Sequence, residues 1–370
     1  MKLWKEELMR KFYKFAIIIS LMINIGLVGF VFNLYQNQTN GSSVETNVIN
    51  TNITEFSSEL SQAIEKASKS VVAIKTNKQG IYSYGSGVIV NQSEGLVDII
   101  TNAAIINNAE TVEVLFANGQ TLSANILGSD TASDLGLVQA SVDFNVPVID
   151  ISSSQSLKLG QFVAVIGSSP LNISNNAALG IISHVATMID MDLNGDEIND
   201  WQVLTVQSDA NVSTFNTGGA MINLKGELVG IASSRLANTL GLSAGSLSVA
   251  IPSDEALVIG HQLKEKGSVT RALLGINVID IASLTTYQRS YLGIDLDMNQ
   301  GMYVTGVNEQ LSGSLVGLQV GDVITSIGNK SINSLADYRK ALYVNDDQSS
   351  ISITYIRNNE SNSVSLELVR

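Results

Sequence analysis

Residues 211–231, NVSTFNTGGAMINLKGELVGI, place Thr217 directly before the glycine pair Gly218 and Gly219 and end in an apolar segment. Short apolar segments bounded by Gly and Asn are typical of strands joined by turns. Glycine in a hairpin permits two backbones to approach closely. The stretch therefore predicts a tight turn that carries a hydroxyl side chain and leads into short strands.

Similar short strands fill the chain as far as about Val249, with turn residues between them. This pattern is typical of an all-β barrel or sandwich, and the segment is long enough for two small barrels. The clearest strand segments are GSGVIVN (85–91), LVDIIT (96–101), ETVEVLFANGQTLSANILG (110–128), FVAVIG (162–167), WQVLTVQ (201–207) and GELVGIA (226–232). Before them, TEFSSELSQAIEKASKSVVAIKT (54–76) predicts a short helix that runs into a strand.

A separate C-terminal module follows a predicted linker helix. In IPSDEALVIGHQLKEKG (251–267), Ser253 is the expected N-cap and Gly267 the expected end of the helix. Further short strands and one helix near 335–343 then predict a small α+β module of about a hundred residues.

The composition excludes several classes of site. The chain of 370 residues is 45% hydrophobic, which supports packed cores, and its formal charge of -13 argues against nucleic acid as a partner. The absence of cysteine excludes disulfides, thiol catalysis and cysteine-bound metal. With His184 and His261 as its only histidines, the sequence predicts neither a metal site nor a cofactor.

The N-terminus predicts a membrane anchor. An uncharged apolar run from Phe15 to Tyr35 follows Lys11 and Lys14, and it is long enough to cross the ~30 Å hydrocarbon core of a bilayer as a helix. The basic residues that flank the run all precede it, so the positive-inside rule places the N-terminus in the cytoplasm and the folded part outside. A cleaved signal peptide is the alternative, although the run is long for one and no small-residue cleavage site follows it.

Taken in order, a series of motifs resembles the HtrA family of membrane-anchored serine proteases, in which a trypsin-like double β-barrel precedes a PDZ domain. The motifs are GSGVIV (85–90), TNAAIINNA (101–109), NGQTLSANILGSDTASDLGLV (118–138), VAVIGSSPLN (163–172), LGIIS (179–183), QSDA (207–210), NTGGAMINLKGELVGI (216–231) and AIPS (250–253). The resemblance implies a mostly β fold with a transmembrane helix at its N-terminus. The expected parts are a cytoplasmic tail (1–13), the anchor (14–35), a flexible linker (36–55), the protease-like domain (56–250), the linker helix (251–271) and the PDZ domain (272–370).

The resemblance also implies where catalytic residues would stand, and there the sequence departs from the family. The general base maps onto Ala104, the acid that orients the base onto Asp134, and the nucleophilic serine onto Thr217. The oxyanion-loop positions fall on Phe215, where the family has glycine, and on Asn216. The triad is therefore degenerate, because its base is missing and its nucleophile is changed.

Chemistry predicts that such a site is nearly inert. A hydroxyl is a weak nucleophile until a base takes its proton, so the loss of the base alone removes on the order of 10⁶ in rate by analogy with triad knockouts. Thr217 adds a methyl group that crowds the attack path, and Phe215 is expected either to turn its amide away or to strain the loop. Asp134 is then expected to accept backbone amides in a turn, and His184 and His261 are expected to be structural.

Two further segments are candidate binding sites. The acidic loop from Asp190 to Asp200 begins like a calcium loop, but Trp201 stands where the anchoring Glu would be, so an exposed hairpin tip is the preferred interpretation. In the PDZ-like module the resemblance implies that the loop before GINVID binds a peptide's C-terminal carboxylate through its amides, with a charged residue just upstream. The candidate peptide-binding residues are Arg271, Leu273, Leu274, Gly275 and Ile276. The alternative is that LLGI only leads into a buried strand.

These features leave three hypotheses about function. The preferred one is a membrane-anchored pseudoprotease that binds peptide C-termini or unfolded proteins outside the cytoplasm and acts in envelope protein quality control or regulation. The resemblance implies a homotrimer, or a hetero-oligomer with an active homologue. The second is an endopeptidase with a rearranged site that uses Thr217. The third is a structural or chaperone-like shell without specific binding.

Overall fold

The computed structural model describes residues 22, 25–31, 33–35, 55–169, 172–191, 201–212, 214–240, 247–309, 311–343 and 350–367. Most of the predicted tail, anchor and linker lies outside these residues. In the described part of the chain, no helix is both long and apolar enough to cross a membrane. The chain divides into two compact units, Met1–Ser61 and Gln62–Arg370, and the strands and their helices belong to the second.

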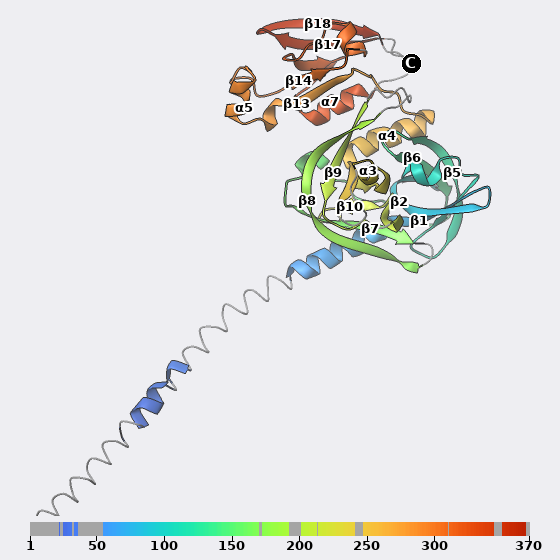
Figure 1. Cartoon of the computed structure of the whole chain (residues 1–370). Coiled ribbons are helices and arrows are strands. Elements are labelled where there is room, and N and C mark those ends of the chain that lie inside the picture. The colour runs from blue at the N-terminus through green and yellow to red at the C-terminus, as the bar shows by residue number, and fades with distance from the viewer. Residues whose placement is uncertain are drawn as a thin grey trace, which may run out of the picture. The chain divides into compact units, whose positions relative to one another are not determined.

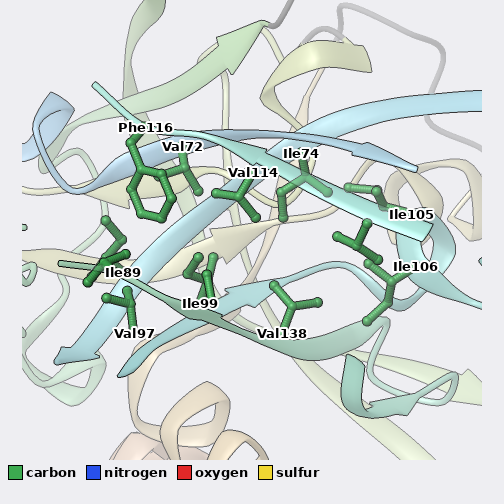
Figure 2. Close-up of a cluster of buried hydrophobic side chains, with 13 residues drawn as sticks. Val72, Ile74, Ile89, Val97, Ile99, Ile105, Ile106, Val114, Phe116 and Val138 are labelled. Atoms are coloured by element: carbon green, nitrogen blue, oxygen red, sulfur yellow. The ribbon is translucent and has the colours of Figure 1, made fainter. Parts of the chain in front are cut away.

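Six antiparallel strands close a first barrel in the order β1-β2-β3-β6-β5-β4. Its elements are β1 (Val71–Lys78), β2 (Ile81–Ser93), β3 (Leu96–Thr101), α2 (Ala103–Ile106), β4 (Thr111–Leu115), β5 (Thr121–Asp130) and β6 (Leu135–Ser141). β-Branched side chains, which suit the pleated surface of a sheet, make up most of the barrel's core (Figure 2). Members of this core include Val72, Ile74, Ile89, Ile99, Ile106, Val114 and Val138.

A second barrel closes in the order β10-β11-β12-β9-β8-β7 (Figure 1). Its strands are β7 (Phe162–Ser169), β8 (Asn172–Met191), β9 (Trp201–Ser208), β10 (Ala220–Ile222), β11 (Leu228–Ala232) and β12 (Ser248–Pro252). The short helices η1 (Ser154–Ser156), η2 (Thr214–Asn216) and α3 (Ser234–Thr239) lie in its connections. The structure thus confirms the predicted strands and the double barrel.

The linker helix α4 (Ser253–Lys266) follows β12, and Gly267 ends it with φ 76°. Glycine suits this left-handed position because it has no side chain to clash with the backbone. The N-cap prediction was wrong by one residue. Pro252 is the N-cap, and the Ser253 hydroxyl instead donates to the carbonyl oxygen of Ser152 at 2.7 Å.

The C-terminal module is a sheet in the order β13-β14-β15-β17-β18, with β16 paired to β15. Its elements are β13 (Ile276–Asp280), η3 (Ile281–Ser283), α5 (Thr286–Tyr291), β14 (Met302–Val307), α6 (Ser312–Leu315), β15 (Val323–Ile327), β16 (Lys330–Ser331), α7 (Leu335–Leu342), β17 (Ser350–Arg357) and β18 (Glu360–Glu367). Helix α7, which was predicted, packs on β15 and β16. Helix α5 was missed, although Thr285 and Gln288 form a capping box that the sequence shows as T-x-x-Q.

Candidate functional site

The fold brings the three triad positions together. Ala104 lies in α2, Asp134 in the turn between β5 and β6, and Thr217 between η2 and β10. Asn102 connects them, since its Nδ2 donates to the carbonyl oxygen of Asp134 at 2.9 Å and its Oδ1 accepts the Thr217 hydroxyl at 2.7 Å. Residues from the two barrels therefore form one hydrogen-bonded cluster that contains the positions to which the family resemblance assigns the triad.

Asp134 is fully buried, and its carboxylate has donors on both oxygens. Oδ1 accepts the amide of Ala104 at 3.0 Å, and Oδ2 accepts the Ser233 hydroxyl at 2.6 Å. The Nε atom of Arg235, in α3, lies 3.3 Å from Oδ1. The carboxylate thus accepts a backbone amide, as predicted, and its charged neighbour is an arginine rather than an imidazole.

Burial raises the pKa of Asp134 above its usual value. The hydrogen bonds from Ser233 and Ala104 and the charge of Arg235 lower the pKa, but they do not offset the loss of hydration. The Arg235 side chain is 36% exposed, so water screens its attraction for the carboxylate. The ionised form of Asp134 therefore costs the folded protein stability.

Replacing Asp134 with Asn tests this raised pKa. A folded-state pKa above the unfolded value means that the stability contributed by Asp134 is present at acid pH and is lost as pH rises through the raised pKa. The free energy of unfolding of the wild type minus that of Asp134→Asn should therefore fall as pH rises above about 4. Urea unfolding at a series of pH values measures this difference.

Asp98→Asn is a matched control with the opposite sign. Burial alone would raise the pKa of Asp98, but hydrogen bonds from Lys264, Asn91 and Gln139 outweigh it and lower the pKa. The stability contributed by Asp98 is therefore present above the unfolded pKa and is lost as pH falls. Equal slopes for the two variants would contradict the assignment for Asp134.

The hydroxyl of Thr217 has no basic partner among its hydrogen bonds. It donates to Asn102 Oδ1 and accepts from the amide and the hydroxyl of Ser234, both at 3.1 Å. His184 lies in β8 and His261 on the exposed side of α4, and neither is among the partners of this hydroxyl. An amide oxygen accepts the proton weakly, so this arrangement does not activate the oxygen of Thr217.

The oxyanion-loop segment forms the 3₁₀ helix η2. The carbonyl oxygen of Phe215 accepts the Ser86 hydroxyl at 2.5 Å, and the Ser86 amide donates to the carbonyl oxygen of Thr217 at 2.9 Å. Phe215 does not have a positive φ, so its backbone does not take the left-handed conformation that favours glycine. Whether its amide turns away stays a prediction. Gly218 takes the left-handed position instead, with φ 79°, and a Cβ there would lie 2.3 Å from the carbonyl oxygen of Ser86.

Five residues of this site were not predicted from the sequence, namely Ser86, Asn102, Ser233, Ser234 and Arg235. Ser86 lies within the GSG motif of residues 85–87, from which we inferred the fold and not the site. No sequence pattern marks Arg235, since its proximity to Asp134 arises only when the two barrels pack together.

The predicted peptide-binding loop lies directly before β13. The carbonyl oxygen of Leu274 accepts the amide of Gly313, and that of Gly275 accepts the amide of Asn308, both at 2.8 Å. Gly275 has φ 63°, and a Cβ there would lie 2.3 Å from the Cβ of Leu311. The loop is therefore held by its carbonyl groups in a conformation that requires glycine.

Arg271 does not lie as the sequence predicted. Its side chain is 6% exposed and forms an ion pair with Asp130, at the end of β5 in the first barrel. Its guanidinium carbon also lies 5.0 Å from the centre of the Trp201 ring. Arg271 is therefore already paired, and the prediction that it serves as a charge partner for a peptide carboxylate does not fit this geometry.

The acidic loop is described only at its start. Asp190 belongs to β8 and its Oδ1 accepts the Gln202 side chain at 2.8 Å, while residues 192–200 lie outside the described residues. The preference for a hairpin tip over a calcium site stays a prediction.

Comparison with known proteins identifies both domains. Residues 85–231 match the trypsin-like peptidase domain family, and residues 272–368 match the PDZ domain family. The chain is 30% identical over 369 residues to the serine protease Do-like HtrA of Lactococcus lactis subsp. cremoris (strain MG1363), covering 90% of each chain. It is 32% identical over 278 residues to the periplasmic pH-dependent serine endoprotease DegQ of Escherichia coli (strain K12), covering 74% of this chain and 56% of DegQ.

A solved structure supports the same assignment. The HtrA-type protease AlgW, determined with a tripeptide, matches with a TM-score of 0.56 and 26% identity, and the match covers 84% of this chain and 96% of AlgW. The order of the two domains, the double barrel and the extent of the sequence match all support the same family assignment. This chain therefore belongs to the HtrA family of serine proteases, with a trypsin-like domain followed by a PDZ domain.

Proposed function

We propose that this protein is a non-catalytic HtrA-family member that binds peptide C-termini or unfolded segments through its PDZ domain. It acts in protein quality control or its regulation outside the cytoplasm. The first part of the proposal, the loss of proteolysis, rests on the site around Thr217. The second part, the retention of peptide binding, rests on the PDZ domain.

One observation carries the first part. The Thr217 hydroxyl donates its single proton to the amide oxygen of Asn102, and Asp134 is paired with Arg235, so no base links the acid position to the nucleophile position. Attack on an amide bond requires that the hydroxyl proton be removed in the transition state. The described partners of Thr217 offer no group that can remove it.

The PDZ loop supports the second part. The carbonyl groups of Leu274 and Gly275 accept the amides of Gly313 and Asn308, which holds the loop in place. Successive amides with a glycine at positive φ form a nest that suits a carboxylate. β13 lies at the edge of its sheet, so an extended peptide can add to it as a further strand.

The apolar run from Phe15 to Tyr35 supports an N-terminal anchor in the cytoplasmic membrane, with the folded domains on the outer side. The description of DegQ as periplasmic is consistent with that side. We include in the proposal a homotrimer or a mixed oligomer with an active homologue, as the family resemblance implies.

Two assays on the same preparation of the full chain test the proposal. We expect no cleavage of denatured casein above a sample without enzyme, and we expect binding of decapeptides from a library with free C-terminal carboxylates. Cleavage that Thr217→Ala abolishes would overturn the first part in favour of a rearranged endopeptidase. Failure of every peptide to bind would overturn the second part and favour a structural shell.

A further inference from the structure

Arg271 is the residue two positions before the proposed peptide-binding loop, and the first barrel holds its side chain. Its Nη1 donates to Asp130 Oδ1 at 2.9 Å and its Nη2 donates to Asp130 Oδ2, which makes the pair bidentate. Asp130 also accepts the amide of Ser133 at 3.0 Å and the Ser133 hydroxyl. Both partners of the ion pair are buried, at 6% and 9% side-chain exposure.

Aromatic rings from two elements enclose the guanidinium of Arg271. Its Cζ lies 5.0 Å from the centre of the Trp201 ring, at the start of β9, and 5.5 Å from the centre of the Tyr343 ring, after α7. The two rings meet edge to face with their centres 5.8 Å apart. A planar cation that packs against aromatic rings and forms a bidentate ion pair loses conformational freedom, so the direction of this side chain is fixed.

The backbone beside Arg271 is fixed as well. Arg271 forms a bridge with Tyr343, and the amide of Ala272 donates to the carbonyl oxygen of Leu342 at 2.8 Å. At the other end of the loop, Asn308 and Gly313 donate to the carbonyl groups of Gly275 and Leu274. The segment 273–275 is thus held at both ends, and the end beside Arg271 depends on Asp130.

We propose that Arg271 is a positioning residue, through which Asp130 of the first barrel holds the peptide-binding loop in its binding conformation. The inference rests on the proposed function of that loop. Arg271 itself does not contact the peptide carboxylate, because turning towards it would leave Asp130 buried without its charge partner. Its Nε, which has no acceptor among the described residues, is buried too.

Asp130→Asn separates this role from direct contact with the peptide. A decapeptide that binds in the library screen is prepared as the free acid and as the C-terminal amide, and both affinities are measured for the full chain. If Arg271 positions the loop, the preference for the acid over the amide should fall about tenfold, equivalent to about 1.4 kcal/mol. Arg271→Lys, which keeps the charge but loses the bidentate fork, should show a smaller fall.

A rise in the preference for the acid would mean that Arg271 contacts the peptide itself. If Arg271 binds the carboxylate, Asp130→Asn frees its guanidinium and the preference for the acid should rise, which would overturn the inference. An unchanged preference would also overturn it. Asp322→Asn is the control, because it breaks another Asp–Arg pair, which joins buried Asp322 to Arg357 within the C-terminal module, and it should leave the preference unchanged.

Hydrogen exchange tests the inference without any peptide. The amides of Ala272, Asn308 and Gly313 are bonded around the loop, so their exchange should accelerate in Asp130→Asn and not in Asp322→Asn. If the wild type binds no peptide but this acceleration is seen, the proposed function fails and the positioning role stands. If peptide binding is normal and exchange is unchanged, the positioning role fails alone.

Discussion

The variant Ala104→His/Phe215→Gly/Thr217→Ser is expected to cleave denatured casein on the order of 10³-fold faster than the wild-type chain. Residues of a triad act as a unit worth about 10⁶ in rate, so a partly restored site should recover a substantial share of it. The amide of Ala104 lies 3.0 Å from Asp134 Oδ1, so a side chain at position 104 starts beside the carboxylate that would orient it. Release of fluorescent peptides from labelled casein measures the rate.

The single substitutions should not raise the rate of casein cleavage. Ala104→His alone leaves the Thr217 hydroxyl bonded to Asn102, and Thr217→Ser alone supplies no base. Arg235 competes with a new imidazole for Asp134, so adding Arg235→Ala should raise the rate of the triple variant further. Adding Asp134→Asn should abolish most of the gain. A wild-type chain that already cleaves as fast as the triple variant would contradict the degenerate assignment.

Glu255→Ala is expected to lower the free energy of unfolding by about 3–5 kcal/mol. Glu255 Oε1 accepts the Nη2 of Arg339 at 2.7 Å and the Tyr343 hydroxyl, and the Glu255 and Arg339 side chains are each 4% exposed. Removing the carboxylate leaves the Arg339 charge buried without a partner, although its guanidinium still lies 4.2 Å from the Trp201 ring centre. Urea unfolding followed by circular dichroism measures the loss.

Glu65→Ala is the matched control, because it also removes a carboxylate from an ion pair. Glu65 pairs with Lys69, and their side chains are 75% and 56% exposed. The loss of this pair should therefore leave the unfolding midpoint unchanged within error. Glu255→Gln, which keeps an acceptor for Arg339, should fall between the two. Equal effects of Glu255→Ala and Glu65→Ala would show that burial does not determine how much the Glu255–Arg339 pair contributes to the free energy of unfolding.

The site around Thr217 shows how much can be predicted from residue patterns. From the order of the motifs we predicted that Ala104, Asp134 and Thr217 stand at the triad positions. The fold brings these residues close together, with Asn102 bonded to Asp134 and Thr217 and the amide of Ala104 bonded to Asp134. The prediction that Asp134 accepts a backbone amide was confirmed. Arg235 could not be predicted, because its approach to Asp134 depends on how α3 of one barrel meets a turn of the other.

One prediction for the PDZ module, that Arg271 is a charge partner for a peptide carboxylate, does not fit the structure. A cation two residues before a carboxylate-binding loop is a reasonable charge partner when only the sequence is read. In the structure Arg271 turns towards Asp130, which lies 141 positions earlier in the chain. Local sequence cannot show this, because the energy of a buried ion pair depends on partners brought together by domain packing.

The sequence by itself determined the strand segments, the linker helix and the order of the two domains, since these follow from local periodicity and residue identity. It also has Ala104, not a histidine, where the family resemblance implies the base. The tertiary structure alone decided which groups surround Asp134 and Thr217 and which acid holds Arg271. Hydrogen bonds and ion pairs act over a few ångströms, so their partners are fixed only when distant segments have packed against one another.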